Sequence, residues 1–292
     1  MKLGIALLAG SCLIVTQLVA AAPPVVDAVQ MPAWLERNGQ RSPLAPGVSL
    51  QARDKVITGQ NARLLIQMPE GSLVKLGENA TLGLDDVSES GAATRRLVNA
   101  SLDVVRGAFR FTTQAVTRFR GERDVRIRIA TVTAGIRGTD LWGKSDDKRD
   151  LVCLIEGRIS VTHATQAPVM LDQPLDFFVA PKDGTPPQKA KVDQRQIDEW
   201  ARETEIAAGQ GSARRGGKWR VIVLKADNQQ DALAAYDAVR AAGYPARITV
   251  ARSAAGPSYR VDIGNLSSES EALALATRLK QQLAIAEPAV SR

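Results

Sequence analysis

The sequence predicts a chain of two domains: an all-β region, then a small α+β domain with its elements in the order βαββαβ. Its 292 residues suffice for two domains of ordinary size. One observation is a repeat: Trp219–Leu224 and Tyr259–Gly264 both begin with an aromatic residue, Arg and Val, and each precedes a helical pattern containing Ala-Leu-Ala. The other is a series of short apolar segments between Pro32 and Pro181, separated by Gly, Asp and Asn, with no long helical pattern.

The first residues predict export. Met1 and Lys2 form a short positive region, Leu3–Val19 is apolar and uncharged, and small residues end the segment at Ala21. This pattern is typical of a signal peptide spanning residues 1–21, so we expect a periplasmic protein. Two alternatives stay open: an uncleaved membrane anchor, since the segment is just long enough to span a bilayer, or a lipoprotein acylated on Cys12. The Pro- and Ala-rich stretch Ala22–Val29 is interpreted as the mature N-terminal tail.

Charge and cysteine content narrow the function classes. A net charge of +7 indicates either an anionic partner or a basic bias that serves solubility. No dense Lys/Arg run is present, which argues against a nucleic-acid partner. After cleavage, Cys153 would be the one remaining cysteine, and it lies in the apolar run Leu151–Ile155. We therefore expect a buried structural cysteine and no intramolecular disulfide.

The all-β region contains an internal sequence repeat. Val105–Phe111 and Ile155–Val161 share the pattern apolar, charged, Gly, any, apolar, polar, apolar. Gly107 and Gly157 at the third position predict corners with positive φ between two strands. Recurring corners favour a β-solenoid or a rolled sheet. In the same region Val125–Ile129 alternates strictly, which predicts a half-buried strand.

A glycine-containing motif lies between the two repeated segments. Gly135 and Gly138 predict a tight turn in which Arg137 and Asp140 pair, while Thr139 bonds backbone groups. One interpretation is a structural corner with an internal ion pair. The other is a ligand contact made by Arg137. Trp142, just after the motif, is expected in the core.

Residues Val132–Gly143, with VRGAFRFTT before them and LIEGRISVTH after them, closely resemble the FecR domain, over roughly residues 32–180. The resemblance implies an extracytoplasmic, β-rich, solenoid-like domain. Its namesake relays a signal from the periplasm to an anti-sigma activity inside the cell. The apolar segment of this chain begins at Leu3, so we expect no sigma-factor-binding part ahead of it.

Residues 181–217 are interpreted as a linker that contains one helix. An amphipathic pattern spans Lys191–Ala208, with Asp193 as N-cap and Gln196 at the position that completes a capping box. We expect this helix to pack on the all-β region through Trp200; a coiled-coil or partner-binding helix is the alternative. Gly209–Gly217, which contains two adjacent arginines, predicts a flexible basic hinge.

The C-terminal domain, residues 218–292, is expected to have one open sheet face. The predicted strands are Trp219–Leu224, Ala246–Ala251, Tyr259–Ile263 and a short one within Ile285–Val290, with helices after Asn228 and Ser268. Because both helices cover the same face, alternation leaves the other face open. The side chains expected there are Arg220, Ile222, Arg247, Thr249, Ser258, Arg260 and Asp262.

The segment Lys218–Val290 resembles the SPOR domain, the sporulation-related repeat, most clearly in YRVDIGNLSSESEA. The resemblance implies a ferredoxin-like fold that binds peptidoglycan glycan strands stripped of stem peptides on the helix-free sheet face. Carried over by position, Ile222, Lys225, Ser258 and Arg260 are candidate glycan-binding residues, joined by Arg220 and Arg247 from the open face. Ile222 stands where the family usually has Gln, and Leu224–Ala226 departs from the family's Gly-Ser-Phe.

We therefore expect an exported, non-enzymatic envelope protein that binds peptidoglycan glycan strands through its SPOR-like domain. The FecR-like domain would serve as a scaffold or bind an envelope protein. The alternative is a FecR-type signalling protein that acts through protein contacts. An enzyme is disfavoured because His163 is the single histidine and no catalytic set, metal cluster or phosphate loop is visible. We expect no cofactor, no metal and, with the signal peptide cleaved, no membrane contact.

Overall fold

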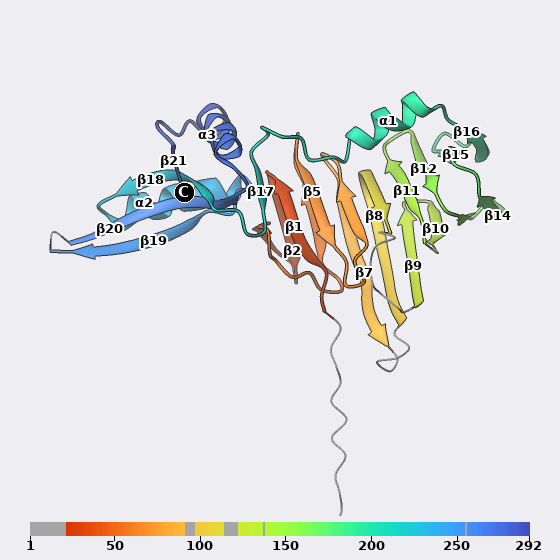
Figure 1. Ribbon diagram of the computed structural model, residues 1–292, viewed down its shortest axis with the longest axis horizontal. Helices are drawn as coiled ribbons and strands as arrows, with labels where there is room; N and C mark the ends of the chain where they lie inside the picture. Colours follow the sequence, from red (N-terminus) through yellow and green to blue (C-terminus); the bar gives the residue numbers. More distant parts are fainter. Residues whose placement is uncertain (1–21, 91–96, 114–121, 137, 255) are drawn as a thin grey trace, which may run out of the picture.

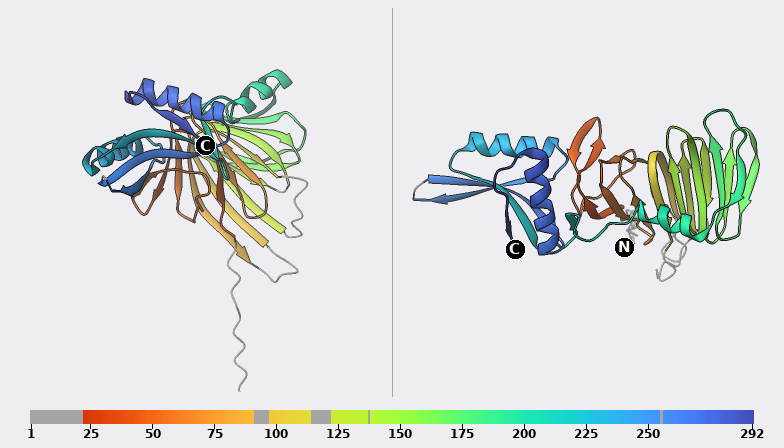
Figure 2. Two further views of the ribbon diagram at one scale, coloured as in Figure 1. Left: turned by 60° about the vertical axis from the view of Figure 1, so that its left-hand side comes forward. Right: turned by 90° about the horizontal axis from the view of Figure 1, so that it is seen from above.

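The computed structural model describes residues 22–292 except 91–96, 114–121, 137 and 255 (Figure 1). The signal peptide predicted at residues 1–21 and the side chain of Arg137 therefore lie outside the described residues. The described chain is mostly β, with an α+β unit at its C-terminal end. The β region and this unit lie one after the other along the long axis of the molecule (Figure 2).

Two layers of strands form the β region, and the long strand β8 (Leu97–Thr112) belongs to both. Side chains from both layers share one core, which includes Val26, Leu64, Val56 and Ile127. The first layer also contains β1 (Val25–Gln30), β5 (Arg63–Gln67), β6 (Leu73–Leu76), β11 (Asp140–Ser145), β12 (Arg149–Glu156), β15 (Asp176–Pro181) and β16 (Gln188–Lys191). The second contains β2 (Ala33–Arg37), β3 (Gln40–Pro43), β4 (Lys55–Thr58), β7 (Thr81–Ser90), β9 (Glu122–Ile129), β10 (Val132–Ile136), β13 (Ile159–His163) and β14 (Gln166–Leu171).

The pairing order follows from these strands. The first layer runs β16-β15-β12-β11-β8-β6-β5-β1, and the second runs β3-β2-β4-β7-β8-β9-β10-β13-β14. Neighbours pair antiparallel except β8 and β9, which are parallel. Within the described strands, β3 and β14 each have one neighbour, so the second layer stays open at both ends.

Alternation places the β9 side chains as the sequence predicted. Val125, Ile127 and Ile129 are buried in the core, whereas Arg126 and Arg128 are exposed. Successive side chains of a strand point to opposite faces, so a strictly alternating pattern determines which face is exposed to solvent. The half-buried strand predicted for Val125–Ile129 is confirmed.

Gly107 and Gly157 form corners between the two layers, which confirms the corners with positive φ that the sequence predicted at these glycines. Gly107 has φ +88 at the point where β8 leaves the second layer for the first, and a Cβ there would lie 2.5 Å from Ala80. Gly157 has φ +94 between β12 and β13, and a Cβ there would lie 2.5 Å from the carbonyl oxygen of Gly138. Both positive φ and the close neighbour exclude a larger residue.

Two local interpretations were wrong. The stretch Ala22–Val29, expected to be a tail, contributes β1, whose Val26 and Val29 are fully buried between partners distant in the sequence. Gly135, expected in a tight turn, lies inside β10 opposite Arg126 and Ser160. Strand partners on both sides hold each segment extended, and such partners are not visible in a short stretch of sequence.

Helix α1 (Gln194–Arg202) packs on the outer face of the first layer through Trp200, as predicted. The Trp200 ring stacks on Trp142 with 4.9 Å between centroids and 8° between planes, and Phe177 meets Trp200 edge-on. Asp193 caps the helix by accepting the N–H of Gln196. The helix is shorter than predicted at both ends: Lys191 belongs to β16 and Asp193 is the N-cap, and the helix ends at Arg202.

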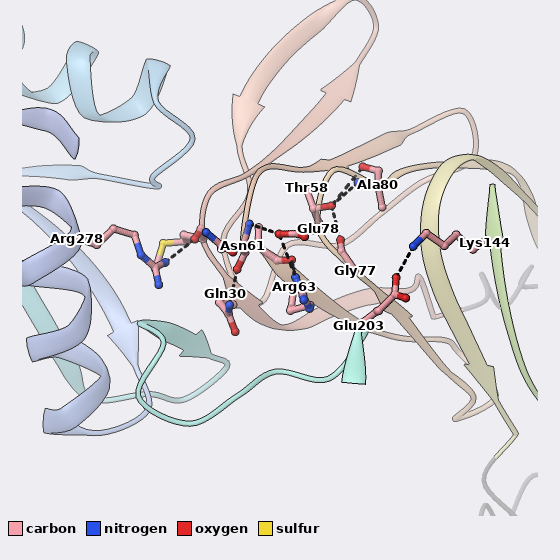
Figure 3. Close-up of polar contacts among 12 residues, drawn as sticks. Gln30, Thr58, Asn61, Arg63, Gly77, Glu78, Ala80, Lys144, Glu203 and Arg278 are labelled. Carbon is pink, nitrogen blue, oxygen red and sulfur yellow. Dashed lines mark hydrogen bonds and ion pairs between the residues drawn. The ribbon is translucent and has the colours of Figure 1, made fainter. Parts of the chain in front are cut away.

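Beyond α1 the chain crosses the first layer toward the C-terminal unit. Glu203 pairs with Lys144 of β11 at 2.8 Å (Figure 3). Glu205 pairs with Lys75 of β6 and Arg110 of β8. These two acidic side chains form ion pairs with basic side chains on the outer face of the first layer. The segment therefore lies along the β region.

The C-terminal unit consists of β18 (Trp219–Ala226), α2 (Gln229–Ala241), β19 (Arg247–Ser253), β20 (Gly256–Leu266), α3 (Glu269–Leu283) and β21 (Ala289–Ser291). Its strands pair antiparallel in the order β21-β18-β20-β19. Both helices pack against this sheet. In α2, Ala232 and Val239 are buried whereas Leu233 is 41% exposed, and Val250 of β19 is 50% exposed.

Strand β17 (Ser212–Arg214) joins the two parts, so the predicted flexible hinge is wrong for these residues. β17 pairs with β1 on one side and with β20 at Ala213 on the other, which makes one sheet continuous across the junction. The guanidinium of Arg278 in α3 donates to the carbonyl oxygen of Met31 at 2.8 Å (Figure 3). It also donates to the carbonyl oxygen of Gln210 at 2.8 Å. The C-terminal unit is therefore docked on the β region.

Candidate functional site

The open face of the C-terminal sheet brings the predicted residues into two cross-strand rows. In one row Arg247 of β19 and Ile222 of β18 flank Asp262 of β20. In the next row Thr249 and Lys225 flank Arg260 in the same way. Ser258 follows, opposite Ala251. Since residues 258, 260 and 262 alternate on one strand, all these side chains share a face.

A bulge in β18 decides that Lys225 belongs to this face. Strict alternation would put Ile222 and Lys225 on opposite faces. The pairing of β18 with β20 shifts between Ile222 and Leu224, so Ile222 lies opposite Asp262 and Lys225 lies opposite Arg260. A β-bulge inserts one extra residue and reverses the alternation beyond it. The irregularity falls in the stretch where the sequence departs from the SPOR pattern.

A first depression on this face, called here the lysine hollow, has a volume of about 530 Å³. It contains three of the predicted glycan-binding residues, Lys225, Ser258 and Arg260, whereas Ile222 is not part of its wall. The remaining wall residues are Ala226, Asp227, Thr249, Ala251 and Tyr259. The structure therefore brings an ammonium, a guanidinium and hydroxyls together around one open space.

A second depression, called here the arginine hollow, has a volume of about 390 Å³ and contains the other two predicted residues, Arg220 and Arg247. Sequence reasoning did not select Lys218, Trp219 or Arg292, which line it as well. Their proximity depends on the turn between β17 and β18 and on the pairing of β21, which bring distant residues together. The remaining wall residues are Gly217, Asp262, Gly264 and Asn265.

Asp262 connects the two hollows. Its side chain is 6% exposed, and its Oδ2 accepts a hydrogen bond from Nε of Arg260 at 2.8 Å. Nη1 of Arg220 lies 3.9 Å from the same oxygen. This carboxylate holds the Arg260 guanidinium in place through one nitrogen. The Arg260 side chain remains 37% exposed. The other N–H groups of Arg260 can therefore donate to a ligand.

The glycine-containing motif of the β region is an internal corner. Oδ1 and Oδ2 of Asp140 accept from Nε and Nη2 of Arg110 at 2.9 and 2.7 Å. This hydrogen-bonded carboxylate raises the pKa of Arg110. Thr139 Oγ1 donates to the carbonyl oxygen of Arg158 at 3.2 Å, and Gly138 has φ +67. Arg137, the predicted partner of Asp140, lies outside the described residues, and no signal in the sequence pointed to Arg110.

Two family models match the chain: FecR protein over residues 54–160 and SPOR domain over residues 215–292. The chain carries a FecR domain and a SPOR domain. SPOR domains bind peptidoglycan and occur in the cell envelope. The SPOR match covers β18 to β21 and both hollows, and the FecR match covers both glycine corners and the motif between them.

No curated protein matches the chain. Two crystal structures of an anti-sigma factor candidate from Parabacteroides distasonis ATCC 8503 are similar at 15% identity and a TM-score of 0.39. Each alignment covers 50% of this chain, and this chain spans 64% and 63% of those two.

Two further features concern the surroundings of these domains. Within residues 22–292 as described, no three His, Cys, Asp or Glu side chains gather in a way that could hold a metal ion. The helices of the same residues include none with the length and apolarity needed to cross a membrane. The two hollows on the open face of the SPOR domain are the site that the geometry favours.

Proposed function

We propose that this protein is an exported, non-enzymatic envelope protein that binds peptidoglycan glycan strands on the open sheet face of its SPOR domain. The observation that carries the proposal is the lysine hollow, where Lys225, Ser258 and Arg260 line one open space. The strand order β21-β18-β20-β19 with both helices on one side supports the ferredoxin-like arrangement expected of this domain.

The chemistry of this face suits a polar polymer. Glycan strands present hydroxyl and acetamido oxygens, which accept hydrogen bonds from ammonium, guanidinium and hydroxyl donors. Arg260 is fixed by Asp262, so little side-chain entropy is lost when it binds. The face is a strip along the strands without enclosing walls, which allows a long chain to pass across it.

The FecR domain is proposed as a scaffold or a surface for an envelope protein. Its Gly-x-Arg-Gly-Thr-Asp motif supports the scaffold role, because Thr139 and Asp140 bond to groups of the same domain. The match to the FecR model favours a second candidate function, an envelope signalling protein that acts through protein contacts. Export through residues 1–21 is part of the first proposal.

The test uses the mature chain 22–292, because β17 ties the SPOR domain to β1. The chain is incubated with purified sacculi before and after an amidase removes the stem peptides, and the bound fraction is measured after sedimentation. We expect stronger retention on denuded sacculi. Arg260→Ala should weaken it about tenfold, since hydrogen bonds to charged groups contribute about 1.5–3 kcal/mol.

Arg252→Ala is the matched control. Arg252 lies on the same strand as Arg247 but points to the opposite face, because it pairs opposite Pro257 and alternates with Ala251. Arg252→Ala removes one positive charge, as Arg260→Ala does, but leaves the open face unchanged. Retention of this variant should therefore equal that of the unaltered chain. If neither kind of sacculus retains the chain, the glycan-binding proposal is wrong and the signalling function remains.

A further inference from the structure

A cleft of about 360 Å³ lies in the β region beside the corner that Gly107 forms, and is called here the corner cleft. Among the described residues, the charged side chains of its wall are those of Arg63, Glu78, Arg106, Lys144, Asp146 and Glu203. They come from β5, β8, β11 with the turn after it, the turn after β6, and the segment after α1. Small-molecule sites of proteins occupy about 300–1,000 Å³, so the cleft has the size of a small binding site.

The charge of Arg63 is only weakly compensated. Its Nη1 donates to the carbonyl oxygen of Ala62 at 2.7 Å and lies 4.0 Å from Oε2 of Glu78 (Figure 3). Within the described residues Nε is buried without an acceptor, and no hydrogen bond engages Nη2. Burial lowers the pKa of this guanidinium, and the charges of Glu78 and Glu203 oppose the shift only in part. An anion beside Nη2 would therefore stabilise the charged side chain.

The carboxylates of the wall each use one oxygen for the fold. Oε2 of Glu78 accepts the N–H of Asn61 at 2.7 Å, and Oε2 of Glu203 pairs with Lys144 at 2.8 Å. Oδ1 of Asp146 accepts two backbone N–H groups of its own turn. In the part of the chain that the structure describes, the second oxygen of each carboxylate has no hydrogen bond. These oxygens can accept hydrogen bonds from a cationic ligand group.

Charges of both signs in one wall limit the kind of ligand. A simple anion would be repelled by the three carboxylates, and a simple cation by Arg63, Arg106 and Lys144. A zwitterion, by contrast, can place its carboxylate on a guanidinium and its ammonium group on a carboxylate at the same time. The small volume favours a molecule of about amino-acid size over a segment of a polymer.

We propose that the corner cleft binds a zwitterion of the amino-acid class, with its carboxylate on Arg63 and its ammonium group on Glu78 and Asp146. The inference goes beyond glycan binding and does not depend on it, because every wall residue precedes the segment 215–292 that matches the SPOR model. The β region would then recognise a small molecule in addition to carrying the SPOR domain.

The experiment measures saturation-transfer NMR signals of the standard amino acids in the presence of the mature chain 22–292. The amino acid with the strongest signal is then titrated beside its methyl ester, which lacks the carboxylate, and its N-acetyl form, which lacks the ammonium group. We expect each derivative to bind about tenfold more weakly, because each loses one charge-assisted contact. Absence of a signal from every amino acid overturns the proposal, and so does equal binding of the amino acid and both derivatives.

Two substitutions assign the binding to this cleft. Arg63→Gln should weaken binding of the amino acid about tenfold but leave the affinity for the methyl ester unchanged, because the ester has no carboxylate for Arg63 to hold. Glu78→Gln should weaken binding of the amino acid but leave the affinity for the N-acetyl form unchanged, since a Gln side chain can still accept the N–H of Asn61.

Arg195→Gln is the matched control. Arg195 is an exposed residue of α1 outside the cleft wall, so the variant removes one positive charge and should keep the full affinity. Circular dichroism checks that all three variants are folded. An equal loss for the amino acid and its methyl ester in Arg63→Gln overturns the role of Arg63, and unchanged binding in both Arg63→Gln and Glu78→Gln overturns the site.

Discussion

The carboxylate of Glu271, in the first turn of α3, accepts hydrogen bonds from the backbone N–H of Ser212 at 2.8 Å and of Gly209 at 2.6 Å. The spacing Ser268-x-x-Glu271 has the form of a capping box, in which the Glu271 side chain would bond back to the backbone of Ser268. The Ser268 hydroxyl does accept the N–H of Glu271, but the Glu271 carboxylate bonds to the chain that enters β17. A residue 5% exposed thus fastens the SPOR helix to the junction between the two parts.

Glu271→Ala should destabilise the chain by about 2 kcal/mol, because the buried N–H of Ser212 and the N–H of Gly209 both lose their acceptor. Urea unfolding followed by circular dichroism measures the change. Glu269→Ala, an exposed position in the same helical turn, is the control and should change stability by no more than about 0.5 kcal/mol. Equal losses in the two variants would contradict the role assigned to Glu271.

Gly243 is predicted to tolerate no side chain. It ends α2 with φ +88, and a Cβ there would lie 2.5 Å from the Trp34 ring and 2.8 Å from Pro32. Gly243→Ala combines backbone strain with a clash at the contact between the SPOR domain and the β region, so we expect a loss of more than about 2 kcal/mol.

Gly216→Ala separates the two effects, because Gly216 has φ +82 and open space around it. It should cost about 1 kcal/mol from backbone strain alone. Thermal unfolding monitored by tryptophan fluorescence compares the two variants. A Gly216→Ala loss as large as that of Gly243→Ala would mean that the contact with Trp34 contributes nothing.

Stability should fall in acid partly through Asp150. Burial raises the pKa of this fully buried carboxyl, but hydrogen bonds from Thr131, Lys182 and Ser145 outweigh it and hold the pKa below its ordinary value of 3.8. A depressed folded-state pKa contributes stability above the unfolded value, and that stability is lost as the pH falls through the folded value. The loss should therefore begin below about pH 4.

Asp150→Asn tests this directly. The variant should be less stable at pH 7 and should lose less further stability between pH 5 and pH 2, as read from urea midpoints. Asp237→Asn, an exposed residue, should follow the pH profile of the unaltered chain. An unchanged slope in Asp150→Asn would show that this carboxyl does not contribute to the acid transition.

Cys153 is predicted to be inert in the folded protein. It is fully buried, which confirms the expectation from its apolar run, and burial together with the nearby Asp176 raises its pKa to about 12. Since the thiolate is the reactive form, the mature chain should not react with Ellman's reagent at pH 8 until it is unfolded. One thiol should then react, and Cys153→Ala should give none. Rapid reaction in the native state would contradict the burial.

Local patterns predicted the features that depend on neighbours along the chain. The alternation at Val125–Ile129, the caps at Asp193 and Asn228, and the glycine corners at 107 and 157 were readable because each needs only a few consecutive residues. The packing of Trp200 was also predicted, since an exposed tryptophan on an amphipathic helix is unfavourable. Resemblance then supplied the FecR and SPOR domains and their candidate residues.

Pairings between distant segments could not be predicted in this way. The bulge at Ile222–Leu224 decides that Lys225 meets Arg260, yet nothing in β18 alone marks a shift of register. Arg110 as partner of Asp140 and β17 as a strand between β1 and β20 depend on which segments meet in space. The arginine hollow is such a case, because its wall comes from three strands, a turn and Arg292 beyond β21.

The sequence by itself determined the content of the chain: a β region with glycine corners, a packed helix, and a C-terminal α+β unit with an arginine-bearing open face. The tertiary structure decided the strand registers, the docking of the SPOR domain on the β region, and the grouping of the face residues into two hollows. The physical reason is one of range. Periodicity, capping and backbone freedom act within a few residues, whereas register and docking minimise the free energy of the whole packed chain.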